Sequence, residues 1–251
     1  MDNLSLALTF TLVLVAITIS YHERLNLEKE LLVGSLRAVA QLTAIGFVLT
    51  YVFDASNAWL TTCILLLMIY NAMTVAAKRG HGIDRVKRIS YLSILAGLVI
   101  TLGGLVLFNT VQYQPSQIIP ISGMIVGNAM IALGIAFGRL RDGFRQRRDE
   151  VETKLCLGAT PIEAARSIVQ DSIRAAMQPT VDSMKTVGIV QLPGMMTGLI
   201  LAGSSPLLAI KYQIMVSFML AGAVSIASFL ACFWAYRRFF NAAEQLIAPE
   251  D

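Results

Sequence analysis

Charged side chains are scarce in this chain, and their scarcity excludes an ordinary soluble domain. Only 14% of the 251 residues are charged and 56% are hydrophobic, whereas a soluble domain carries about 25% charged residues. Cysteine is also rare. Cys63 and Cys232 fall in apolar runs and Cys156 in a polar segment predicted to be cytoplasmic. They predict no disulfide framework and are interpreted as small packing residues.

Catalytic motifs are missing as well. The sequence contains no G-x-x-x-x-G-K-[ST] phosphate loop, no H-E-x-x-H zinc motif and no nucleophile elbow. Its two histidines, His22 and His81, both fall in predicted loops. None of the 16 acidic residues lies in the middle of an apolar run, where an ion-coupled carrier often needs a carboxylate. We therefore predict that the chain is not an enzyme and holds no cofactor of its own.

Long apolar runs dominate what is present. Runs long enough to cross the ~30 Å hydrocarbon core of a bilayer occur about seven times. They cover residues 4–20, 33–53, 58–77, 91–108, 118–138, 181–203 and 212–236. The sequence thus predicts an all-α, multi-pass membrane protein, with about seven transmembrane helices in a single domain, residues 1–251.

Basic residues follow the first, third, fifth and seventh runs, while the connections 54–57 and 109–117 contain neither Lys nor Arg. Because Lys and Arg accumulate in cytoplasmic loops, this alternation predicts an outside N-terminus and a cytoplasmic C-terminus. The same bias accounts for the net charge of +4, so no nucleic-acid partner is predicted.

The longest polar segment, residues 139–180, is predicted to be cytoplasmic and to form a helix, a corner and a second helix. Gly158 favours a helix end, because glycine tolerates the left-handed backbone. After Ala159, the residues Thr160, Pro161 and Glu163 have the N-cap, first-turn and capping-box positions of a new helix.

The second helix is predicted to be amphipathic, with one face that packs and one that meets water or a partner. The packing face comprises Ile162, Ala165, Ile168, Val169, Ile173 and Ala176, and the polar face Glu163, Arg166, Gln170, Asp171 and Arg174. Two interpretations stay open at this point: a helix lying on the membrane surface, or a surface for a soluble partner.

The sixth run contains Gln191, Pro193 and Gly194 near its middle, followed by Met195 and Met196. Proline removes a backbone donor, so this helix is predicted to be kinked or broken, and opened backbone must face protein or a water-lined cavity. The two thioethers are candidate ligands for a transition metal, although thioethers prefer Cu(I) over iron.

The fifth run adds Met124, Asn128 and Met130 to this candidate translocation pathway. The competing interpretation is that the methionines and glycines of both runs serve helix packing alone. Lys185 enters the sixth run near its cytoplasmic end, where it is interpreted as snorkelling or as neutralised by Asp182.

The run LCLGATPIEAARSIVQDSIRAAMQP resembles the cytoplasmic coupling segment of ATP-binding-cassette (ABC) permeases, in which a Gly-Ala corner precedes a short helix that docks on the ATPase. With NAMTVAAKR, GMIVGNAM and QLPGMMTGLILAGSSPLLAIKYQ, it is similar to the FetB (YbbM) family of iron-export permeases, which is related to the membrane subunit of plant aluminium-tolerance transporters. The resemblance extends from about Gly34 to Arg238.

This resemblance implies a permease subunit that exports iron or another metal, pairs with a separate FetA-type ATPase and forms a homodimer in the bilayer. The ATPase would supply the ATP and Mg²⁺ site. Gly158, Ala159, Thr160, Pro161 and Glu163 would form the ATPase-coupling element. One departure affects the docking residues: the Glu-Ala-Ala triplet precedes the glycine in importers but follows it here.

Three alternatives remain at this point. The chain could be a carrier or channel that works alone, or a membrane scaffold that recruits a soluble protein. It could also be an ABC permease for a non-metal substrate such as a sugar conjugate.

Overall fold

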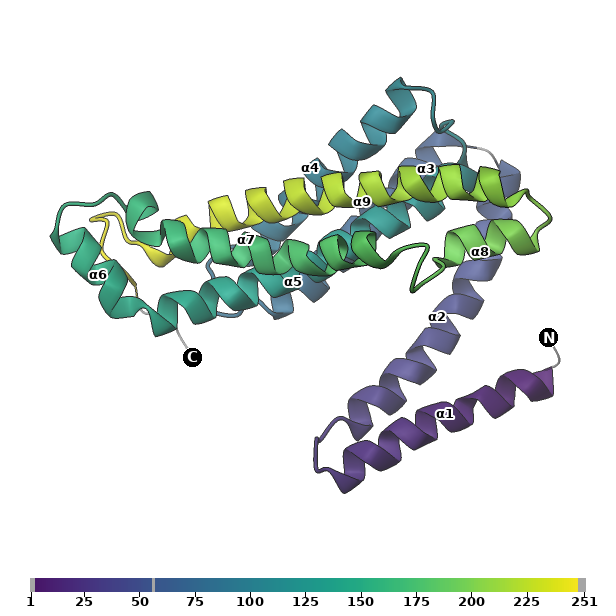
Figure 1. The fold of residues 1–251 in the computed structure, drawn as a ribbon, viewed down its shortest axis with the longest axis horizontal. Coiled ribbons are helices and arrows are strands. Elements are labelled where there is room, and N and C mark those ends of the chain that lie inside the picture. The colour runs from purple at the N-terminus through teal and green to yellow at the C-terminus, as the bar shows by residue number, and fades with distance from the viewer. Residues whose placement is uncertain (1–2, 56, 248–251) are drawn as a thin grey trace. The chain divides into compact units, whose positions relative to one another are not determined.

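Every named element of the chain is a helix in the residues that the computed structural model describes, 3–55 and 57–247 (Figure 1). Side chains of residues 3–7, 54 and 55 lie outside the description. The α-helices are α1 (Asn3–His22), α2 (Glu28–Ala55), α3 (Ala58–Lys78), α4 (Val86–Leu107), α5 (Pro115–Gln146), α6 (Arg148–Cys156), α7 (Pro161–Thr186), α8 (Gly194–Leu201) and α9 (Pro206–Ala235). A short 3₁₀ turn, η1 (Tyr236–Phe239), follows α9.

The chain divides into two compact units, residues 1–57 and 58–251. The first is a hairpin of α1 and α2, and a buried serine closes its turn. The Ser20 hydroxyl donates to the Glu28 carboxylate at 2.8 Å and accepts the Leu27 N–H at 3.1 Å. Most apolar side chains of α2 are exposed, as expected for a helix that meets lipid or a partner.

The second unit is built around α5, which packs against α3, α7 and α9, while α9 also packs on α4 and α7 (Figure 1). Phe137, Phe144, Ile118, Ile125 and Leu133 of α5 are fully buried. This apolar core continues beyond the predicted fifth span, because α5 extends to Gln146 without interruption.

Two glycines allow helices of the second unit to approach closely. A Cβ at Gly97 of α4 would lie 3.1 Å from the carbonyl oxygen of Ala223 in α9. A Cβ at Gly143 of α5 would lie 2.6 Å from Cγ2 of Ile168 in α7. Small residues at these crossings therefore set the α4–α9 and α5–α7 packing.

Five helices of the described chain are long and apolar enough to cross a membrane: α2, α3, α4, α5 and α9 with η1. They match five of the predicted spans. The predicted first span is the shorter apolar helix Leu8–His22 within α1. The predicted sixth span, 181–203, is not one helix. It consists of the end of α7, a non-helical segment and α8, and the predicted break is confirmed.

Candidate functional site

The predicted corner lies between α6 and α7, and local backbone geometry specifies it. Gly158 has φ +89°, the left-handed conformation predicted for a helix end. Its N–H donates to the Leu155 carbonyl at 2.9 Å, and the Ala159 N–H donates to the Lys154 carbonyl at 3.0 Å. These two bonds satisfy carbonyls that the end of α6 would otherwise leave unpaired.

The start of α7 is capped as predicted. Pro161 is its first residue, and Glu163 turns its carboxylate back onto Thr160. One oxygen of Glu163 accepts the Thr160 N–H at 2.9 Å and the Thr160 hydroxyl at 2.6 Å. These bonds hold the pKa of Glu163 below its usual value, with a smaller contribution from the Arg166 charge. The corner is therefore stabilised from both sides.

Apolar side chains are exposed at this corner. Leu157 is 83% exposed and Ile162 is 36% exposed. The prediction that Ile162 packs is wrong, because helical side chains lean toward the N-terminus and Ile162, in the first turn, lies over the exposed corner. The rest of the predicted face packs: Ala165, Ile168, Val169 and Ala176 are buried, and Ile173 contacts the core.

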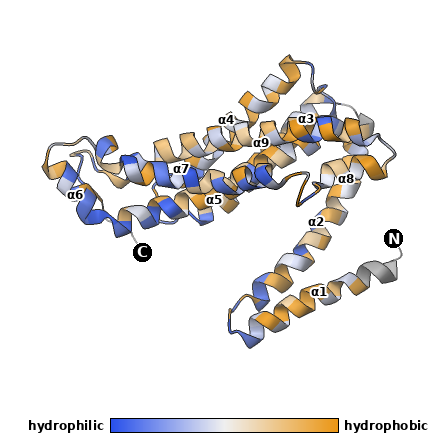
Figure 2. Ribbon diagram, in the orientation of Figure 1, coloured by the Kyte–Doolittle hydropathy of each residue, from blue (hydrophilic) through white to orange (hydrophobic). Residues whose placement is uncertain are grey.

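The opposite face of α7 carries an unbroken row of exposed polar residues at helical spacing, which we name the polar stripe. It comprises Glu163, Arg166, Gln170, Arg174, Gln178, Asp182 and Lys185. Figure 2 shows hydrophilic residues along α6 and α7, beside the largely hydrophobic α9. At the edge of the stripe, Asp171 accepts from Arg147 at 2.7 Å and from Arg174 at 3.3 Å, which ties α7 to the α5–α6 junction.

At its other end α7 stops at Thr186, and residues 187–193 form a turn before α8. Gly188 has φ +83° and its N–H donates to the Gln191 carbonyl at 2.9 Å. The Gln191 amide also donates to the Ser183 hydroxyl at 2.9 Å. Pro193 is the N-cap of α8, so the proline begins the next helix and does not kink the previous one.

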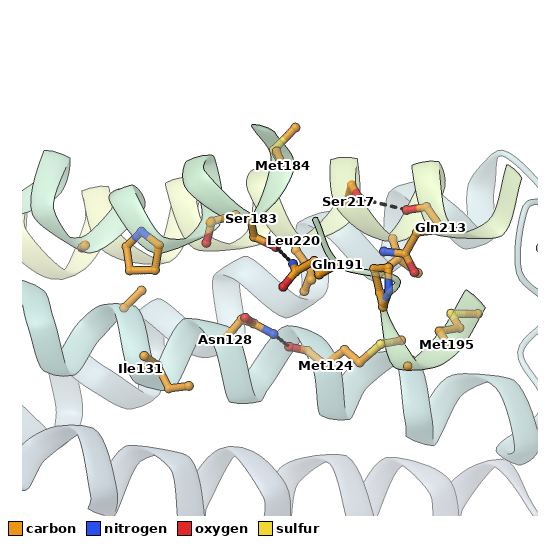
Figure 3. Close-up of a pocket in the computed structure, with 17 residues that line it drawn as sticks. Met124, Asn128, Ile131, Ser183, Met184, Gln191, Met195, Gln213, Ser217 and Leu220 are labelled. Atoms are coloured by element: carbon orange, nitrogen blue, oxygen red, sulfur yellow. Dashed lines mark hydrogen bonds between the residues drawn. The ribbon is translucent and has the colours of Figure 1, made fainter. Parts of the chain in front are cut away.

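A cavity of about 310 Å³ lies beside this turn, between α5, α7, α8 and α9 (Figure 3). The structure brings most of the predicted pathway residues to its wall: Met124, Asn128, Gln191, Pro193, Gly194 and Met195. Two others do not line it. Met130 packs against the apolar core, and Met196 is half-buried in α8.

Oxygen and nitrogen atoms of neutral side chains face the cavity. The Asn128 amide donates to the Met124 carbonyl at 2.8 Å. The side-chain oxygen of Gln213 is buried and accepts no hydrogen bond within the described residues. The described wall contains no charged side chain, so the cavity offers amide oxygens and thioethers to a ligand.

Sequence reasoning missed Gln213, Ser183 and Ser217 as wall residues (Figure 3). Gln213 carried a signal, since it is a polar residue inside the apolar run of α9. The two serines carried none, because serine occurs in packed membrane helices without a ligand.

A second cavity, of about 500 Å³, is lined by the connection 109–112 and the first turns of α5. Met124 and Met195 line both cavities, and Met215 lines the second. Thioether side chains therefore lie between the two cavities. Among the described residues, no group of three or more His, Cys, Asp or Glu could hold a metal ion.

Asp182 and Lys185 form an ion pair, 3.5 Å apart, at the end of α7 that adjoins the cavity. Arg79, just beyond α3, is level with Gly134 of α5. Asn128, which shares the cavity wall with Ser183, precedes Gly134 by six residues, or about 9 Å of helix. Lys185 follows Ser183 along α7, away from the corner. That Lys185 lies near a cytoplasmic end stays a prediction. Its partner Asp182 is as predicted.

The family model described as "Uncharacterised protein family (UPF0014)" matches residues 3–240 of the chain. A relative from Escherichia coli (strain K12), named "Probable iron export permease protein FetB", is 46% identical over 99% of this chain and 96% of its own length. This match confirms the resemblance inferred from the motifs.

Plant relatives are similar over almost the same length. "Protein ALUMINUM SENSITIVE 3" of Arabidopsis thaliana is 40% identical over 96% of this chain and 88% of its own length. "UPF0014 membrane protein STAR2" of Oryza sativa subsp. japonica is 42% identical over 93% of this chain and 82% of its own length. No solved structure matches the chain significantly.

Proposed function

The chain is a multi-pass membrane permease that belongs to the uncharacterised protein family UPF0014, and we propose that it is the membrane subunit of an ATP-driven iron exporter of the inner membrane. The observation that carries the proposal is a locally fixed, exposed corner joined by one helix to a membrane cavity. The name of the Escherichia coli relative supports both the cargo and the direction of transport.

In this proposal, the corner docks on a separate FetA-type ATPase, which binds the ATP and Mg²⁺. Leu157 and Ile162 supply an exposed apolar contact, and the bonds of Gly158 and Thr160 hold it in one conformation. A short preorganised helix end of this kind suits a groove on a partner.

Helix α7 would transmit the movement of the ATPase to the cavity. It has 26 residues, so it is about 39 Å long, with the corner at one end and the Gln191 turn at the other. Its buried face packs on α5 and α9. A displacement of the corner would therefore shift α7 against both helices and alter the cavity wall.

We further propose that two copies assemble around the polar stripe. The side chains of Asp182 and Lys185 are 55% and 67% exposed. If the cavity lies within the bilayer, as this proposal requires, a charged group facing lipid beside it would cost about 2.5–3.5 kcal/mol or more. A second copy across a water-filled path would remove that cost. The scheme retains about seven spans in one domain and an outside N-terminus, and it places the corner of the 139–180 coupling segment in the cytoplasm.

The neutral cavity wall bears on the form of the cargo. A bare Fe²⁺ ion would find amide oxygens and thioethers there but no carboxylate within the described wall. This favours weak, transient binding, as transport requires, or a cargo that is already complexed. A neutral organic or sugar conjugate is the second candidate, and the same observation supports it.

The test is ATP-dependent uptake into inside-out vesicles that contain the chain and its candidate ATPase. We expect radioactive iron to accumulate only with ATP, and Gly158→Val to reduce the rate about tenfold or more while insertion and ATPase binding persist. Gly138→Val is the matched control, because a Cβ at Gly138 of α5 meets no atom within 4 Å.

The outcomes separate the alternatives. Iron flux that needs neither ATPase nor nucleotide would indicate a stand-alone carrier or channel. An intact complex with ATPase activity but no iron flux would retain the permease and exclude iron as cargo. An intact complex that shows neither ATPase activity nor iron flux would indicate a membrane scaffold.

A further inference from the structure

Four arginines from two distant segments surround a cavity of about 400 Å³ at one end of the second unit. Arg85 and Arg88 lie at the start of α4, and Arg237 and Arg238 follow α9. The remaining wall consists of Ile89, Leu92 and Trp234. This site is separate from the translocation cavity and from the corner, and its assignment does not depend on the proposed function.

The arginines are only partly neutralised. Asp84 contacts Arg85 at 3.6 Å and Arg238 at 3.5 Å, so four guanidinium groups share one carboxylate and the cluster keeps a formal charge of +3. Arg237 lies over the Phe233 ring, 5.6 Å from its centroid. Arg88 has no hydrogen bond or ion pair with any described residue, which leaves its guanidinium free for a ligand.

The start of α4 adds a second reason to expect an anion. The positive end of a helix dipole favours acidic side chains, and the first turn of α4 contains none. Its N-cap position is instead Arg85, with φ 56° and no side-chain cap. Arg85, Lys87 and Arg88 therefore place cations where the helix itself favours an anion, and an external anion would offset both.

The apolar part of the wall selects the kind of anion. Leu92 is 39% exposed and lies nearly two turns into a helix of membrane-crossing length, so its surface faces acyl chains. Trp234 has the position of an interfacial aromatic residue near the end of α9. The guanidinium groups thus lie at headgroup level directly above an apolar surface, whichever way the chain is oriented in the bilayer.

We propose that this cavity binds the phosphate of an anionic phospholipid, with guanidinium groups on the phosphate and an acyl chain along Leu92 and Trp234. Planar guanidinium groups make paired hydrogen bonds to phosphate oxygens, and basic pockets between membrane helices suit such headgroups. The bound lipid links the start of α4 to the end of α9 at the α4–α9 contact.

The test is native mass spectrometry of the purified full chain with phosphatidylglycerol and with phosphatidylcholine of the same acyl length. We expect phosphatidylglycerol to bind more tightly, and each arginine removed to weaken its binding about fivefold, hence about 25-fold for R85Q/R88Q. R85K/R88K retains the charge but lacks the planar guanidinium groups that pair with phosphate oxygens, so its affinity should lie between those of the unmodified chain and R85Q/R88Q. It also controls for misfolding.

The matched control is R139Q/R141Q, which removes the same charge from a second basic cavity beside Lys78 and Arg79. An equal loss of lipid binding in both double variants would overturn the proposal, because it would reduce the effect to general charge. The last measurement is competition of inorganic phosphate with the bound lipid. If it displaces the lipid at micromolar concentration, the site takes free phosphate and the lipid assignment is wrong.

Discussion

The two ends of α7 are both helix interruptions, but they are built in different ways. At the corner, Gly158 donates to the Leu155 carbonyl and Glu163 accepts from Thr160, so these hydrogen bonds are short-range. At the 187–193 turn, Gly188 and the Gln191–Ser183 bond hold a segment whose other side chains are apolar and exposed, among them Ile189 at 89% and Val190 at 78%.

This difference indicates that the two ends of α7 have different mechanical roles. The corner has one strongly preferred geometry, so it can transmit a force without changing shape. The turn is hydrogen-bonded within its own backbone but is little packed, because Ile189, Val190 and Leu192 are exposed. Few packed contacts are a property of a segment that rearranges. Since α7 joins the rigid corner to the more deformable 187–193 turn, a displacement of the corner would change the cavity wall.

The largest effect is expected where α7 is clamped between these two ends. Gly143→Val would force a side chain into Cγ2 of Ile168, which is 1% exposed and cannot move away. Overpacking of this kind costs about 1–3 kcal/mol, so the melting temperature in detergent should fall by several degrees. Gly138→Val has free space and should change it little. Equal losses would show that α7 is not clamped at Gly143.

A matched pair of glycine substitutions compares the ends directly. Gly158→Ala and Gly188→Ala each put a Cβ on a left-handed residue with no atom within 4 Å, so each should cost about 1–2 kcal/mol in backbone strain alone. We expect Gly158→Ala to lower the number of substrates moved per ATP with unchanged apparent affinity. Gly188→Ala should change the apparent affinity. Vesicle flux at graded substrate concentrations measures both, and identical effects would remove the distinction between the ends.

The hydrogen bond that holds the turn should have a smaller, local effect. Gln191→Leu removes the bond to Ser183, which is worth about 0.5–1.5 kcal/mol. Amide hydrogen exchange at residues 187–191 should then accelerate several-fold, while exchange at 158–164 stays unchanged. Ser183→Ala should give the same result, and the double variant should add nothing further. Additive losses would mean that the two residues act separately.

The sequence predicted one end of α7 better than the other, because only the corner follows a known capping pattern. The corner depends on residues within a few positions of one another, so Gly158, Thr160 and Glu163 could be recognised as caps. The break was predicted at Pro193, but the helix ends seven residues earlier, at Thr186. That end depends on Gly188 and on the side chain of Gln191, which no local pattern marks.

The residues of the cavity were likewise predicted only in part from the sequence. Methionine, glycine and proline in two apolar runs indicated Met124, Asn128 and Met195 correctly as neighbours. Periodicity alone could not tell that Met130 turns into the core. It also could not show that Ser183 shares a cavity wall with Asn128, because the level of one helix against another depends on where α7 packs along α5.

The smallest expected effect is a pH dependence that only the corner should show. The pKa of Glu163 is lowered because its carboxylate accepts two bonds from Thr160. Because the folded-state pKa is lowered, the ionised Glu163 stabilises the corner at pH values above the ordinary pKa of 4.5. This stabilisation is lost as the pH falls below 4.5 and through the folded-state pKa. Exchange of the amides at 160–164, corrected for intrinsic rates, should accelerate at pH 3.5 relative to pH 6. Residues 187–193 carry no ionisable side chain, and their exchange should not respond in this way.

In Glu163→Gln the amide oxygen can still accept from Thr160, so the corner should lose its response between these two pH values. A response that persists in Glu163→Gln would assign the titration to another carboxylate, with Glu150 and its bond to Lys154 as the nearest candidate in α6.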